Sequence, residues 1–170
     1  MSAIQEKISS FIKRGGSEAG REHFSALALE VFRYQLEHCP PYKQFVSLLG
    51  TDPGSVDSPE KIPFLPIRFF KSRDVYSASA EPQKLFTSSA TTGMTPSRHL
   101  VADLSLYELS FTKAFEHFYG SPSEYTILAL LPSYLERDGS SLVYMADKLI
   151  KLSKSDLSGF YLYNFAQLRD

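Results

Sequence analysis

The sequence has a single cysteine, Cys39, and this scarcity excludes two kinds of structure. One thiol cannot form an internal disulfide, and a metal site built from several cysteine ligands is impossible. The four histidines show no close ligand spacing along the chain: His23, His38, His99 and His117. We therefore expect no metal site made of protein ligands. Cys39 itself, as a lone cysteine at a helix end, is expected to be buried and inert rather than acylated.

An excess of charge of one sign is also lacking, as are long hydrophobic runs. The 170 residues contain 18 Lys and Arg and 19 Asp and Glu, a net charge of −1, so bulk charge predicts no nucleic-acid partner. The longest strongly apolar run covers residues 127–131, which is far too short to span a bilayer. The first residues lack the basic flank and apolar stretch of a signal peptide. We expect a cytoplasmic protein without a membrane span.

Tryptophan is absent, but 13 Phe and 10 Tyr supply many other rings. Apolar residues make up 43% of the chain, which is ordinary for a globular protein and enough for one domain with a hydrophobic core. The core is expected to be rich in aromatic rings.

Residues 1–58 have the spacing of helices and contain no residue pattern that indicates chemistry. Apolar residues recur at helical intervals over 4–13, and Gly15-Gly16 ends that pattern. A second helix is predicted to start at a Ser17 N-cap and to stop before Cys39-Pro40-Pro41, with a short third helix over 42–49. The apolar face of the second helix is predicted to hold Phe24, Leu27, Ala28, Val31 and Tyr34. We interpret this part as an N-terminal helical cap.

The pattern changes from residue 59 onward. Residues 62–67 are apolar, but their two prolines exclude a helix and a central strand, so an extended, buried segment is predicted. Basic and aromatic residues alternate over 68–73, a pattern that RNA-binding surfaces share. Because the chain has no net basic field, we instead expect Phe69 and Phe70 to pack while the cations reach solvent.

Alternating strand and helix patterns follow over residues 85–164. Short strands are predicted at 85–87, 99–102 and 159–164, and a continuous apolar run over 125–131 predicts a strand buried on both faces. Helices are predicted over 103–119, with Asp103 as N-cap, and after residue 141. The two helices are expected to bury one apolar face each: Leu104, Tyr107, Phe111, Phe115 and Phe118 on the first, and Leu142, Met145, Ala146, Leu149 and Leu152 on the second. The fold class predicted for 59–170 is α/β, a largely parallel sheet with flanking helices, preceded by the N-terminal helical cap.

Residues 84–99 stand out from this scaffold because six hydroxyl residues fall between Thr87 and Thr95. Such short polar side chains cannot form a core, but they can present hydroxyls and backbone N–H groups around a small concavity. That arrangement is how proteins hold an anionic oxygen, above all that of a phosphate. Gly93 has no lysine after it, so the stretch is not a P-loop of the usual pattern.

The stretch Ser88-Ser89-Ala90-Thr91-Thr92-Gly93, followed by residues 94–98, resembles the phosphate-binding loop of adenylate-forming acyl and aryl ligases. The flanking segments Pro63-x-x-Pro66-x-x-Phe69-Phe70-Lys71 and Pro132-Ser133-Tyr134-Leu135-Glu136-Arg137 resemble the acyl-protein synthetase (LuxE-like) branch, which activates fatty acids for the reductase complex of bacterial bioluminescence. The resemblance covers about residues 60–165. In three details the sequence departs from the family loop: Ala90 replaces a glycine, one extra residue precedes Pro96, and Arg98 replaces a lysine.

The resemblance implies a two-step reaction. A (fatty) carboxylic acid attacks the α-phosphate of ATP to give an acyl-adenylate, and the acyl group then moves to a protein thiol. It implies that Ser88, Ser89, Thr91, Thr92 and Gly93 hold the phosphates, that Arg98 neutralises them, and that Mg2+ accompanies ATP. The implied partners are a small-molecule carboxylic acid and an acyl-accepting or reductase protein; no catalytic residue is assigned. Enzymes of this superfamily are about two to three times longer, so 59–170 is expected to be an incomplete part of an adenylate-forming domain that is not active alone.

A second polar stretch, residues 132–141, leaves two further hypotheses open. If both loops line one cleft, Ser133, Tyr134, Arg137 and Ser140 contact the ligand. Ser140 or Ser141 could instead be the nucleophile of a serine hydrolase with His99 or His117 as base, but the Gly-x-Ser-x-Gly pattern is missing and Ser140 is better explained as a helix N-cap. We expect His99 to be a structural group and His117 a surface residue. The remaining alternative is a non-catalytic interaction module that keeps the fold.

Overall fold

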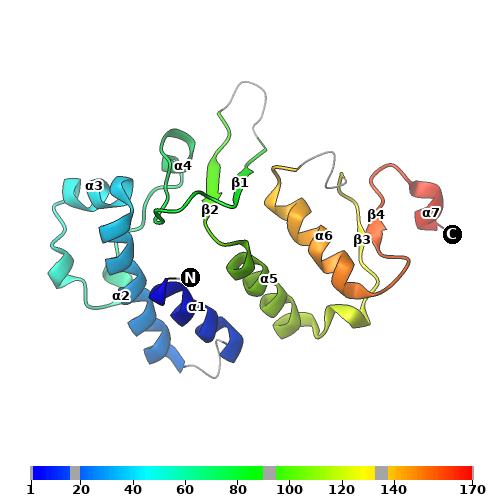
Figure 1. Cartoon of the computed structure of the whole chain (residues 1–170), viewed down its shortest axis with the longest axis horizontal. Helices are drawn as coiled ribbons and strands as arrows, with labels where there is room; N and C mark the ends of the chain where they lie inside the picture. Colours follow the sequence, from blue (N-terminus) through cyan, green and yellow to red (C-terminus); the bar gives the residue numbers. More distant parts are fainter. Residues whose placement is uncertain (1, 16–19, 90–94, 133–137, 170) are drawn as a thin grey trace.

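The structure is a computed structural model of the whole chain, and it describes residues 2–15, 20–89, 95–132 and 138–169. Figure 1 shows α1 to α4 on one side of the molecule, α5 and α6 with β3 and β4 on the other, and the β1–β2 pair between them. The elements are α1 (Ala3–Arg14), α2 (Gly20–His38), α3 (Pro40–Leu48), α4 (Phe69–Ser72), β1 (Lys84–Thr87), β2 (Arg98–Val101), α5 (Leu104–Tyr119), β3 (Leu128–Ala129), α6 (Ser141–Ser153), β4 (Gly159–Phe160) and α7 (Phe165–Arg169).

The three helices predicted for the N-terminal part are confirmed. Helix α1 begins with a capping box, in which Ser2 Oγ accepts from the Gln5 N–H and the Gln5 side chain accepts from the Ser2 N–H at 2.7 Å. It ends at Gly15, whose positive φ of 75° favours glycine. Cys39 separates α2 from α3, because Pro40 starts the next helix at a position where a missing N–H does no harm. Ser17, the predicted N-cap, lies outside the described residues.

The N-terminal helices enclose the first of two core clusters. Its buried members come from α2, α3 and the segment that follows: Phe32, Cys39, Tyr42, Val46 and Val56. Tyr42 also ties this cluster to the proline-containing segment, since its hydroxyl donates to the Pro63 carbonyl at 2.7 Å. That bond fixes the path of residues 62–67 against the helices.

The proline-containing segment is extended, as predicted, but it is not buried. Phe64 and Ile67 are 76% and 78% exposed, although Ile62 and Leu65 pack against the first cluster. Prolines 63 and 66 prevent regular strand pairing, so the chain crosses the surface with some side chains turned inward and others exposed. In the next turn Phe69 packs edge-on against Phe45 while the neighbouring cations stay exposed, so the prediction of packed rings and solvated charges is confirmed.

The strands that flank the hydroxyl-rich stretch form an antiparallel hairpin, with Lys84 opposite Val101 and Thr87 opposite Arg98. Phe86 points from β1 into the second core cluster, which also contains Phe111 of α5 and Tyr144 and Leu149 of α6. The prediction of two short strands is therefore confirmed. Their pairing, however, is antiparallel.

The described residues contain two small sheets, not one large parallel sheet. Besides the hairpin there is only the parallel pair β3–β4, which α6 connects. The run over 125–131 forms a strand only at Leu128–Ala129 and is not buried on both faces, since Leu128 and Leu130 are 47% and 56% exposed. The side chains at 128 and 130 lie on one face of the strand, and that face is uncovered. The predicted strand over 159–164 shortens to Gly159–Phe160, which pairs with β3.

Helices α5 and α6 occur where the sequence predicts them, and Asp103 caps α5 by accepting from the Ser105 N–H at 2.9 Å. The buried faces of α5 and α6 differ from the predicted faces at the helix ends. Phe118 is 75% exposed, and Leu142 and Leu152 lie half exposed. On α6 the buried face is rotated toward Val143, Tyr144, Ala146, Leu149 and Ser153. None of the described helices is both long and apolar enough to cross a membrane.

Candidate functional site

The hydroxyl-rich stretch is the connection of the β1–β2 hairpin, and its base is closed by two serines. The Ser88 N–H donates to the Ser97 carbonyl at 3.1 Å, and the Ser97 N–H donates back to Ser88 Oγ at 2.9 Å. Ser97 is buried, and its Oγ lies 3.0 Å from His99 Nε2. The base is thus held by reciprocal hydrogen bonds, which fixes where the connection leaves the sheet.

The predicted phosphate-binding residues fall into two groups. Ser88 and Ser89 have exposed side chains at the start of the connection, and Thr95 is exposed near its end. Residues 90–94, including Ala90, Thr91, Thr92 and Gly93, lie outside the described residues. The described part therefore offers exposed hydroxyls at both ends of the connection.

Arg98, the predicted counter-charge, starts β2 directly after the connection. Its guanidinium forms an ion pair with Asp74 at 2.9 Å, and both side chains are about half exposed. Exposed pairs of this kind contribute about 0–1 kcal/mol, so the arginine can exchange its partner at little cost. The sequence offers no signal for this pairing, which joins residues 24 positions apart.

The second polar loop meets the hairpin at its base. The Thr87 N–H donates to the Gly139 carbonyl at 2.8 Å, and Lys84 at the start of β1 forms an ion pair with Asp138. The approach is close: a Cβ on Gly139 would lie 2.9 Å from Thr87 Oγ1. The ends of the two polar loops are therefore side by side, while Ser133, Tyr134 and Arg137 lie outside the described residues.

Ser140 and Ser141 have structural contacts. Ser140 is the N-cap of α6, where its Oγ accepts from the Val143 N–H at 3.3 Å, and the Ser141 carbonyl accepts from the Tyr107 hydroxyl at 3.2 Å. His99 is engaged with Ser97, and His117 is exposed beside Phe118. Among the described residues neither histidine is hydrogen bonded to either serine, so no serine–histidine pair is formed there.

Metal ligands and the lone thiol give no further site. No group of three or more His, Cys, Asp or Glu that could hold a metal occurs in the described part of the chain. Cys39 is only 2% exposed, in agreement with the expectation that it is buried. It lies near Tyr42, whose pKa is raised by burial and, to a smaller extent, by this cysteine.

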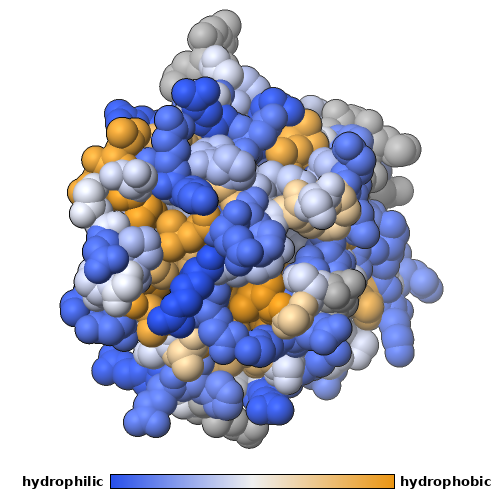
Figure 2. All heavy atoms as spheres, turned by 60° about the vertical axis from the view of Figure 1, so that its left-hand side comes forward, coloured by the Kyte–Doolittle hydropathy of each residue, from blue (hydrophilic) through white to orange (hydrophobic). Residues whose placement is uncertain are grey.

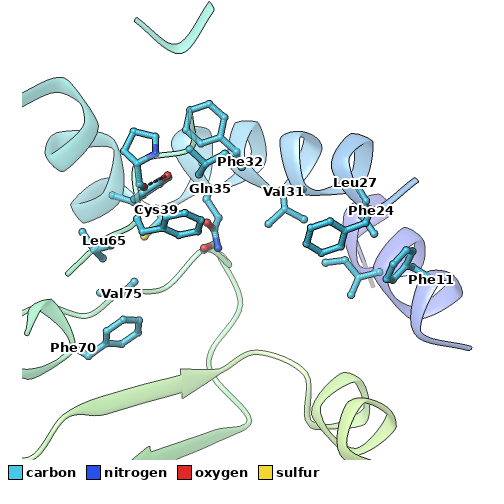
Figure 3. A pocket seen from close by; sticks show the side chains of 17 residues that line it. Phe11, Phe24, Leu27, Val31, Phe32, Gln35, Cys39, Leu65, Phe70 and Val75 are labelled. Carbon is cyan, nitrogen blue, oxygen red and sulfur yellow. Dashed lines mark hydrogen bonds between the residues drawn. The ribbon is translucent and has the colours of Figure 1, made fainter. Parts of the chain in front are cut away.

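Sequence reasoning missed an apolar cavity of about 510 Å3 under α2. Figure 3 shows side chains of α2 pointing into it, among them Leu27, Val31 and Gln35, with Phe11 of α1 at one end and Phe70 and Val75 at the other. Figure 2 shows hydrophobic side chains reaching the surface between hydrophilic ones on this side of the molecule. The helical spacing of α2 predicts an apolar face, but a filled core and an open cavity have the same spacing.

The cavity and the hairpin share one contact. The Phe70 ring lines the cavity and also stacks on the imidazole of His99, with ring centroids 4.7 Å apart.

Comparisons with protein-family models, with curated proteins and with solved structures found no match to this chain.

Proposed function

We propose that the chain is the N-terminal part of an ATP-dependent, adenylate-forming ligase of the acyl-protein synthetase type, and that the hairpin connection binds the phosphates of ATP. The observation that carries this proposal is the closed hairpin base. Reciprocal hydrogen bonds between Ser88 and Ser97 fix the two ends of a hydroxyl-rich connection, and Arg98 follows directly. Hydroxyl groups held in place beside a cation suit a phosphate.

Three of the described residues have groups that suit the phosphates of ATP. Ser88 and Ser89 are exposed hydroxyl donors, and Arg98 needs only to leave an exposed carboxylate to meet an anion. When bound, ATP with Mg2+ supplies the electrophilic α-phosphate and the pyrophosphate leaving group. The chain's own part is to hold the β- and γ-phosphates in place and to neutralise their charge, the contributions that dominate phosphoryl chemistry. A (fatty) carboxylic acid is the proposed attacking substrate, and a protein thiol the acceptor.

The finer fold assignment belongs to the same proposal. In this view β3, α6 and β4 are one unit of a larger parallel sheet of the adenylate-forming domain, which contains more strands than the two described here. The exposed side chains of Leu128 and Leu130 support it, since the helices that pack on the faces of a larger parallel sheet would cover them. A cytoplasmic location follows from the use of ATP.

Isothermal titration calorimetry with ATP and Mg2+ tests the function. We expect saturable binding that inorganic pyrophosphate competes away. The double substitution Ser88→Ala and Ser89→Ala should weaken it by more than about a hundredfold, because two hydrogen bonds to a charged group are lost and each contributes roughly 1.5–3 kcal/mol. Ser47→Ala, an exposed serine of α3, is the matched control and should bind as the unaltered chain does.

Two results would overturn the proposal. One is the absence of ATP binding at millimolar concentration by the folded protein even when it carries its natural C-terminal continuation, which would favour the non-catalytic interaction module. The other is binding that the paired serine substitutions leave unchanged. Labelling of Ser140 by a fluorophosphonate would favour the serine hydrolase, for which the N-cap position of Ser140 is unfavourable.

A further inference from the structure

The cavity under α2 has the form of a groove along a helix. One wall of the groove runs along α2 from Phe24 to Cys39, the residue that follows the helix. These 15 steps at a helical rise of 1.5 Å extend roughly 22 Å. A volume of about 510 Å3 spread over that length leaves a narrow cross-section of roughly 23 Å2, suited to a single extended chain. The volume also falls within the usual range of ligand sites, about 300–1,000 Å3.

The lining is apolar and uncharged. Among the described residues no Asp, Glu, Lys, Arg or His lines the cavity, and its polar members are Gln35, Cys39, Tyr42 and Ser77. The Tyr42 hydroxyl is engaged within the protein, since it donates to the Pro63 carbonyl, and the backbone carbonyl of Ser77 accepts from the Tyr34 hydroxyl at 3.0 Å. A charged ligand group would find no partner inside and would lose its hydration.

We propose that this cavity binds the hydrocarbon chain of a single-tailed amphiphile, with the head group left in solvent. Length, narrowness and neutral lining together select an unbranched chain over a fused ring system or a charged molecule. The site is separate from the hairpin connection, and its binding requires no nucleotide. The proposal therefore stands or falls independently of the proposed ATP site.

Two substitutions on α2 should have opposite effects on the affinity of the cavity for a hydrocarbon chain. Ala28→Phe places a ring in the groove without removing any core contact, because Ala28 faces the cavity from the helix. Gln35→Leu replaces a polar lining group whose side chain points into the cavity (Figure 3) by an apolar one of similar size. Ala26→Phe is the matched control: Ala26 is exposed on the same helix and does not line this cavity.

The experiment is displacement of N-dodecyl dansylamide, whose dye takes the place of the head group and stays outside the groove, by amphiphiles below their critical micelle concentrations, with circular dichroism to verify folding. We expect laurate to compete, and decanoate, shorter by two methylenes, to compete about 15-fold less well, since each methylene changes affinity about fourfold. Dodecyl maltoside and dodecyltrimethylammonium should compete within about fivefold of laurate, because their heads remain in water. Ala28→Phe should abolish binding, Gln35→Leu should strengthen it, and Ala26→Phe should leave it unchanged.

Three results would overturn the proposal. The first is the absence of saturable probe binding by the folded protein. The second is probe binding that Ala28→Phe and Gln35→Leu leave unaltered, which would place the probe elsewhere. The third is a dimer in sedimentation that Ala28→Phe converts to a monomer without any amphiphile binding, since the groove would then be an interface between copies of the chain.

Discussion

Phe70 and His99 stack with their rings 4.7 Å apart and 21° from parallel. This contact joins two parts of the molecule that otherwise have separate cores. Phe70 belongs to the wall of the α2 cavity, while His99 lies on β2 and is linked through Ser97 to the base of the hydroxyl-rich connection. A ligand in the cavity that displaces the Phe70 ring would therefore change the environment of His99 in the hairpin.

This relationship gives a first prediction. On titration with laurate the imidazole proton resonances of His99 should move, because ring-current shifts depend on the position of Phe70. In a Phe70→Leu variant, which keeps an apolar wall, the movement should largely disappear while laurate still binds. His117, exposed beside Phe118 on α5, provides an internal control whose resonances should stay in place. Equal movement of His99 in both proteins would contradict a link through the stacked rings.

A second prediction concerns Gly139, where the two polar loops touch. In Gly139→Ala the new Cβ would lie 2.9 Å from Thr87 Oγ1, so either the Thr87 side chain or the backbone at residue 139 must shift. We expect a loss of about 1–3 kcal/mol in the free energy of unfolding, the usual cost of overpacking, measured by urea denaturation. Thr87→Ala removes the opposing oxygen. In a protein that already carries Thr87→Ala, adding Gly139→Ala should therefore cost little further stability. Additive effects in this cycle would show that the loops do not meet as described.

The helices were the most predictable elements because their signals are local. Gly15 and Asp103 each act on their own backbone, so the end of α1 and the cap of α5 follow from the sequence. Helix α3 was predicted from residue 42, but it begins at Pro40. The packing of Phe69 and Phe70 also followed, since the alternating cations need only reach water. None of these inferences requires knowledge of a distant partner.

The sheets were less predictable because pairing is not local. The apolar residues 125–131 predict a strand buried on both faces only if neighbours cover both sides, and in the structure β4 alone pairs with β3. The pairing of β1 with β2 was missed although both strands were predicted. At the site, the hydroxyl residues were visible in the sequence, but the Arg98–Asp74 pair and the Thr87–Gly139 contact depend on how separate segments meet. The cavity left no signal in the sequence.

A third prediction follows from the N-cap of α6. Ser140→Ala removes the oxygen that accepts from the Val143 N–H and should lower the free energy of unfolding by about 1 kcal/mol. Ser140→Asp should retain most of the stability, because a carboxylate also caps and suits the helix N-terminus. Ser141→Ala, at the exposed first position of the helix, is the control and should change stability by less than about 0.5 kcal/mol. Thermal unfolding followed by circular dichroism distinguishes these cases.

A fourth prediction concerns Glu108, which joins α5 to α6. Burial by itself raises the pKa of Glu108, but hydrogen bonds from Lys148 and Tyr144 and the Lys148 charge outweigh it, so the pKa is lowered. A lowered carboxyl pKa stabilises the fold above the unfolded value, roughly pH 4.3, and this contribution is lost as the pH falls through the folded value. Glu108→Gln should therefore cost about 1 kcal/mol at pH 7 and show a flatter decline in stability below about pH 4.3.

The control for this pH profile lies on the same helix. Glu116 pairs with Lys113 within α5, at 2.6 Å, and no ion pair joins Glu116 to a second element among the described residues. Glu116→Gln should change the free energy of unfolding at pH 7 by no more than about 0.5 kcal/mol, as is usual for exposed helical pairs. Identical profiles for the two glutamine variants would show that the contact between α5 and α6 contributes nothing to acid stability.

The last prediction tests how Arg98 takes part in the proposed phosphate binding. Arg98 is paired with Asp74 in this structure, so a phosphate must compete with that carboxylate for the guanidinium. Asp74→Asn removes the competitor and should strengthen ATP binding by up to about fivefold, since an exposed pair contributes no more than about 1 kcal/mol. Arg98→Gln should weaken binding by more than tenfold, whereas Arg73→Gln, an exposed arginine beside α4, should have a much smaller effect. If Asp74→Asn weakens binding instead, the carboxylate must orient Arg98 toward the phosphate rather than compete for it, and calorimetry on the three variants separates the two cases.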